Sequence, residues 1–105
     1  MGYHQKTINM KTQKIIEAKE IENLELETLN AIFEGQKEKV KKLYLKAEKL
    51  LIKGSDQTRT LVANKFILPL SQLLEMNYSW GREYLNLFPQ QLKAEYCRQI
   101  NSSGI

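Results

Sequence analysis

The sequence predicts an all-α protein, a compact bundle of four to six helices with a helical hairpin at its centre. Apolar residues recur at helical spacing in several segments, and no segment alternates with the period of two that is typical of strands. Glycine and proline residues divide the chain into helix-sized pieces. With 105 residues, 42% of them apolar, the chain is long enough for one core. We expect a flexible N-terminus over residues 1–11, a single helical domain over 12–101 and a tail over 102–105.

The central helix, residues 36–53, has the clearest pattern. Gly35 and Gly54 bracket it, and Ser55 or Asp56 can cap the helix that follows. Its apolar residues fall on one stripe at intervals of three and four residues, and they are Val40, Leu43, Tyr44, Ala47, Leu50 and Leu51. The stripe predicts the face that this helix turns toward the core.

The other helices are predicted with interruptions. Residues 12–34 form an imperfect stripe with Glu22 on it, so a break near Asn23 would make two shorter helices. The third helix begins at Ser55 or Asp56, and Pro69 inside it predicts a kink, because proline lacks a backbone donor and clashes with the preceding turn. Asn77 to Gly81 is interpreted as a loop.

Two short helices are expected at the C-terminal end. Ser79 can cap the first, which runs to about Leu87, and Pro89 suits the first turn of the second. In the second, Leu92, Tyr96 and Ile100 share one face.

The positive charge is concentrated in the central helix. Residues 36–53 hold seven Lys against two Glu, a net charge of +5, whereas the whole chain has a net charge of +4. Five of these lysines share one face and are called the Lys row: Lys39, Lys42, Lys46, Lys49 and Lys53. One interpretation is a solvated face, or one neutralised by the first helix through Glu17, Glu20, Glu25 and Glu27. The other is a binding surface for an acidic protein. Nucleic acid is disfavoured, because this helix has no Arg and no DNA-binding signature.

Two further sets of residues could contact a partner. Leu45 and Ile52 lie across the central helix from its core stripe, so they are either covered by a neighbouring helix or exposed for a partner or a second copy of the chain. Tyr78, Trp80 and Arg82 belong to the residue types that dominate binding hot spots, although a lone Trp in a small helical domain commonly anchors the core.

Catalytic chemistry finds no support in the sequence. His4 is the one histidine and lies in the predicted flexible end, and Cys97 is the one cysteine. No metal-ligand spacing and no glycine-rich phosphate loop occurs, so we expect no metal, no cofactor and no enzyme. The unpaired cysteine, the missing signal peptide and the missing apolar run of membrane-spanning length favour a cytoplasmic protein.

Residues 31–74 order their features in a way that resembles a known family. A helix ends in Phe-Glu-Gly, an amphipathic helix with Val-Lys-Lys and Glu-Lys-Leu-Leu follows, and a Gly-Ser-Asp turn leads to a helix bearing Leu-Val. The segment resembles an uncharacterised family of short bacterial all-helical proteins, some of which are similar to immunity proteins of polymorphic toxin systems. The resemblance implies no catalytic residues, and the C-terminal part departs from it.

These observations favour a small non-catalytic protein-binding module. If the resemblance to immunity proteins extends to function, the module binds a toxin and masks it. The alternative is a nucleic-acid-associated or regulatory module that uses the basic face of residues 39–53. The chain is expected to be a monomer, or a homodimer built on Leu45 and Ile52.

Overall fold

The computed structural model describes the backbone of residues 2–103 and the side chains of residues 18–101. The described chain is all-helical, as predicted. In chain order the elements are α1 (Gly2–Phe33), α2 (Lys37–Lys53), α3 (Asp56–Val62), the π-helical turn η1 (Ala63–Ile67), α4 (Leu68–Met76), α5 (Tyr78–Asn86) and α6 (Gln90–Ser103).

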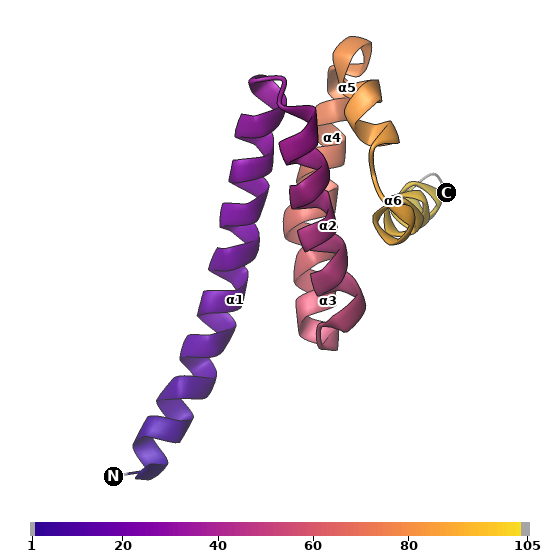
Figure 1. Ribbon diagram of the computed structural model, residues 1–105. Helices are drawn as coiled ribbons and strands as arrows, with labels where there is room; N and C mark the ends of the chain where they lie inside the picture. The colour runs from indigo at the N-terminus through magenta and orange to yellow at the C-terminus, as the bar shows by residue number, and fades with distance from the viewer. Residues whose placement is uncertain (1, 104–105) are drawn as a thin grey trace.

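The helices are arranged around α2 (Figure 1). Helices α1 and α2 lie side by side as an antiparallel hairpin, and α3, η1 and α4 form one continuous run that packs behind them. Helix α5 folds back at the upper end of α4. Helix α6 is seen nearly end-on while α1 and α2 are seen from the side, so α6 runs across the bundle. The N-terminal part of α1 extends beyond the other helices.

The hairpin turn between α1 and α2 is closed by a glycine. Gly35 has φ of +69°, a left-handed conformation that costs an L side chain free energy. The Gly35 N–H donates to the Ile32 carbonyl, and the Gln36 N–H donates to the Ala31 carbonyl. This is the Schellman arrangement, which satisfies the last carbonyls of α1 and confirms Gly35 as a helix stop.

The core lies between α1, α2, the α3–α4 run, α5 and the start of α6. Val40, Tyr44 and Ala47 of α2 are fully buried, which confirms the predicted inward face of that helix. The Tyr44 hydroxyl donates to the Tyr84 carbonyl at 3.0 Å, and its ring packs against Phe88 with centroids 4.8 Å apart. Burial raises the pKa of this phenol far above its usual value. The buried hydrogen bond holds α2 to α5.

The predicted kink at Pro69 takes the form of a π-helical turn. The Leu68 N–H donates to the Ala63 carbonyl five residues earlier, just before the proline. The wider turn relieves the clash of the Pro69 ring with the preceding turn, and the helix continues without a break. The Gln99 side chain of α6 also donates to the Ala63 carbonyl, at 2.9 Å. The irregular turn is therefore a docking point for α6.

Two predictions about helix boundaries are wrong. Helix α1 does not break near Asn23, because its buried residues keep one phase and the misleading residue is Leu26, which is exposed. The segment from Asn77 to Gly81 is not a loop, since α5 begins at Tyr78. Ser79 does not cap it, and Asn77 instead ends α4 by donating from its side chain to the Leu73 carbonyl.

The described backbone is helical close to both ends of the chain. Helix α1 begins at Gly2, and the domain limits given from the sequence stay a prediction. Helix α6 ends at Ser103, and residues 104–105 of the predicted tail lie outside the described residues. Ser55 accepts a hydrogen bond from the Thr58 N–H, which confirms it as the cap of α3.

Candidate functional site

All five residues of the Lys row are exposed on α2. Within the described part of the chain, none of them makes an ion pair. The ion pairs of α2 involve other lysines, since Lys37 pairs with Glu83 of α5 and Lys41 with Glu38. Lys37 donates a hydrogen bond to the Glu83 carboxylate, and this bond together with the negative charge of Glu83 raises the pKa of Lys37. The Lys row is therefore an unpaired stripe of positive charge on a helix that is otherwise charge-matched.

The acidic residues of α1 whose side chains the structure describes make no ion pair with the Lys row. Glu20 lines a shallow depression of about 490 Å³ together with Lys49 and Lys53, but it pairs with neither. Glu25 is half-buried, and burial raises its pKa, with the charge of Glu22 adding to the effect. Glu27 is exposed and makes no ion pair with the Lys row, and the side chain of Glu17 lies outside the described residues.

Leu45 and Ile52 are exposed beside the Lys row. Their exposed fractions are 56% and 57%, so the interpretation in which a neighbouring helix covers them does not hold. They line a shallow depression of about 490 Å³ on α2 together with Glu48 and four lysines, Lys42, Lys46, Lys49 and Lys53. We call the Lys row together with Leu45 and Ile52 the α2 outer face. The structure brings these seven residues together on one helix.

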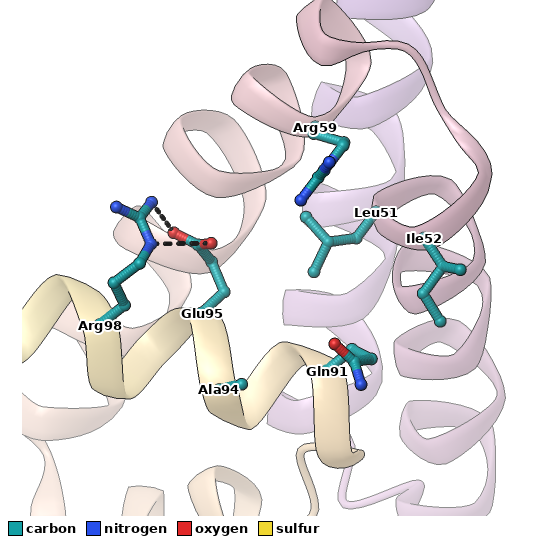
Figure 2. Close-up of a pocket in the computed structure, with 7 residues that line it drawn as sticks. All are labelled: Leu51, Ile52, Arg59, Gln91, Ala94, Glu95 and Arg98. Carbon is teal, nitrogen blue, oxygen red and sulfur yellow. Dashed lines mark hydrogen bonds and ion pairs between the residues drawn. The ribbon is translucent and has the colours of Figure 1, made fainter.

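A second depression, of about 440 Å³, adjoins the α2 outer face and shares Ile52 with it (Figure 2). Leu51 and Ile52 of α2 form one wall, and Gln91, Ala94, Glu95 and Arg98 of α6 form the other. Arg59 of α3 points into the space between them. Arg98 is held by Glu95, as the two dashed lines show, whereas Arg59 makes no ion pair with any described residue.

A contact between α2 and α6 fixes the position of Gln91, which lines the second depression. The Glu48 carboxylate of α2 accepts a hydrogen bond from the Gln91 N–H at 2.9 Å. Gln91 lies in the first turn of α6, where backbone N–H groups lack partners within the helix, so Glu48 caps α6 from outside. Sequence analysis missed this depression, because it joins residues from three helices at separations that no local pattern reports.

The aromatic residues of α5 form two separate contacts. Arg82 lies over the ring of Tyr78, 5.9 Å from its centroid, and both side chains are exposed. Trp80 packs edge-on against Phe33 at the end of α1, with centroids 6.0 Å apart, so it is not a core anchor. The structure thus pairs Tyr78 with Arg82 but places Trp80 with Phe33, a residue the sequence analysis did not select.

Among the described side chains, no cluster of three or more His, Cys, Asp or Glu residues could hold a metal ion. Cys97 is exposed on α6, and the side chain of His4 lies outside the described residues. Over the same part of the chain, no helix combines the length and apolar character that crossing a membrane requires.

Most of the chain matches one protein family. A sequence model described as a domain of unknown function, DUF7674, matches residues 17–102. The chain belongs to the DUF7674 family. The match begins within α1 and reaches almost to the end of α6, so the α2 outer face, the second depression and the aromatic contacts all lie inside the family domain. No curated protein and no solved structure matches the chain.

Proposed function

We propose that this protein is a small, non-catalytic protein-binding module. In the specific form of the proposal it is an immunity-type protein of the bacterial cytoplasm that binds a toxin and masks it sterically. The observation that supports this most is the α2 outer face, where five unpaired lysines lie beside two exposed apolar side chains.

The α2 outer face lacks two kinds of contact when the protein is alone. Lysines at intervals of three and four residues on one helix repel one another, and no described carboxylate pairs with the Lys row. Leu45 and Ile52 are exposed, so a partner could cover them without breaking a contact within the fold. Burying their apolar surface would contribute favourable free energy to binding. A partner with acidic and apolar groups supplies both missing contacts.

The nucleic-acid alternative fits the same face less well. Phosphate-driven binding needs only the charges, and the exposed Leu45 and Ile52 would lie against a polar backbone without compensation. Helix α2 also has no Arg, the residue that reads guanine bases most often. A salt titration tests the nucleic-acid alternative, because the logarithm of the affinity for phosphates falls steeply and linearly with the logarithm of the salt concentration.

The function is tested with the neighbouring gene. If a large secreted multidomain protein is encoded immediately upstream, its C-terminal domain is co-expressed with this protein, and growth and complex formation are measured. We expect growth to be restored and the two chains to elute as one stoichiometric complex. Growth arrest despite soluble expression of both chains, or turnover of a substrate by this protein alone, would contradict the proposal.

A further inference from the structure

The α2 outer face has the spacing of a helix-packing seam. Glu38, Lys42, Leu45, Lys49 and Ile52 follow one another at intervals of four, three, four and three residues, and all five are exposed. That spacing is the one by which a helix packs along a second helix. Leu45 and Ile52 are seven residues apart, which places them about 10 Å apart along the axis of α2. After Glu38 at its first position, the seam alternates lysine and apolar residues.

The seam continues from α2 toward α6. Ile52 lines both depressions, so it lies between Leu45 on one side and Leu51 and Ala94 on the other. Beyond them Arg59 points into the second depression, and it makes no ion pair among the described residues (Figure 2). The surface that follows the apolar positions is therefore positively charged at this end as well.

The charges decide between a second copy of the chain and another partner. Two α2 helices packed along this seam would bring ten lysines of the two Lys rows into one interface, twice the five of each copy. Juxtaposed like charges weaken an interface, and a lysine at a seam position lowers the stability of helix pairing. A helix with carboxylates opposite Lys42 and Lys49 meets neither penalty.

We propose, on the basis of the protein-binding function above, that the α2 outer face receives an acidic amphipathic helix of the partner protein. Its apolar residues, seven apart, pack over Leu45 and Ile52. Its carboxylates lie against the Lys row, and the end of the helix nearest Ile52 presents a carboxylate to Arg59. This mode of recognition is a helix laid along a helical surface, with the charges fixing its identity and register.

The test uses a designed probe. A fluorescein-labelled peptide of about 20 residues, long enough to cover α2, has Leu at seven-residue intervals and Glu at the flanking positions. Its binding to the full-length protein is measured by fluorescence anisotropy at low ionic strength. We expect saturable binding, and we expect the double variant Leu45→Gln/Ile52→Gln to weaken it about tenfold or more. Leu26→Gln is the matched control, because Leu26 of α1 is as exposed as Leu45, at 56%.

A charge swap tests the role of the lysines. Lys42→Glu/Lys49→Glu should abolish binding of the acidic peptide, and a peptide with Lys in place of every Glu should bind this variant and not the unchanged protein. Lys65→Glu/Lys93→Glu changes the net charge equally at exposed positions on η1 and α6, and it should change affinity less than twofold. Far-UV circular dichroism checks that each variant retains its helices.

Each contrary outcome overturns this inference. No saturable binding, equal binding of a scrambled peptide, tighter binding of duplex DNA, or a dimer of the protein in light scattering would each do so. The failures are distinguishable from failure of the proposed function. If a toxin binds the Leu45→Gln/Ile52→Gln variant as tightly as the unchanged protein, the masking function stands and the docking mode is refuted. If the peptide binds but the protein does not protect cells from the toxin, the docking mode stands and the masking function is refuted.

Discussion

Leu51 and Ile52 are neighbours on α2 whose side chains have opposite surroundings, and truncating each one tests the orientation of this helix. Leu51 is 7% exposed and Ile52 is 57% exposed. Leu51→Ala removes buried methyl groups and leaves a cavity, at a cost of about 2–3 kcal/mol, the low end of the usual range because Leu51 borders the second depression. Ile52→Ala loses little burial and gains helix propensity, so its effect stays within about 0.5 kcal/mol.

The measurements are urea unfolding, which gives the free energy of unfolding, and thermal unfolding, which gives Tm, each followed by far-UV circular dichroism. For a domain of this size the difference corresponds to a fall in Tm of roughly 10 °C for Leu51→Ala and a few degrees at most for Ile52→Ala. Equal destabilisation by the two substitutions would refute the reasoning, because it would mean that the outer face of α2 is packed within the protein itself.

Three further predictions concern contacts between helices. Gly81→Ala should lower the unfolding free energy, measured by urea unfolding, by about 1–3 kcal/mol, because a Cβ there would overlap the Leu74 carbonyl oxygen of α4. An increase in the unfolding free energy, which is expected for alanine in place of an unhindered helical glycine, would contradict this packing. Glu48→Ala should cost about 0.5–2 kcal/mol by removing the cap of α6, and amide hydrogen exchange at Gln91 should accelerate; an unchanged rate would rule out the cap. Burial, together with the hydrogen bond that Tyr96 donates to the Glu75 carboxylate, raises the pKa of Tyr96 to about 12. The folded state therefore keeps this proton to higher pH than the unfolded state, and the unfolding free energy should fall as pH rises from about 10 to about 12. The fall should be smaller in Tyr96→Phe, and equal pH profiles of the two proteins would contradict this prediction.

The faces of α2 could be predicted from sequence because they depend on local spacing alone. Val40, Tyr44 and Leu51 on one side and Leu45 and Ile52 on the other follow directly from 3.6 residues per turn. The turn at Gly35 and the cap at Ser55 were likewise local signals.

The parts that sequence did not predict depend on tertiary contacts. Gly81 was interpreted as part of a loop, but it is a helical residue that lets α5 approach the backbone of α4. Leu26 disturbed the apolar phase of α1 because an exposed leucine has the same sequence signature as a buried one. Arg59 and Arg98 face the same depression although they are far apart in the chain, and no spacing rule relates them.

The account predicts that α2 is the docking helix, and amide chemical shifts measured by NMR test this most directly. The isotope-labelled full-length protein is titrated with the acidic peptide, and the shift changes are mapped by residue. We expect the largest changes at Leu45, Lys49 and Ile52, with smaller changes at Arg59 and Gln91 across the second depression. Changes concentrated instead at Phe33 and Trp80, with the α2 signals unmoved, would contradict the account.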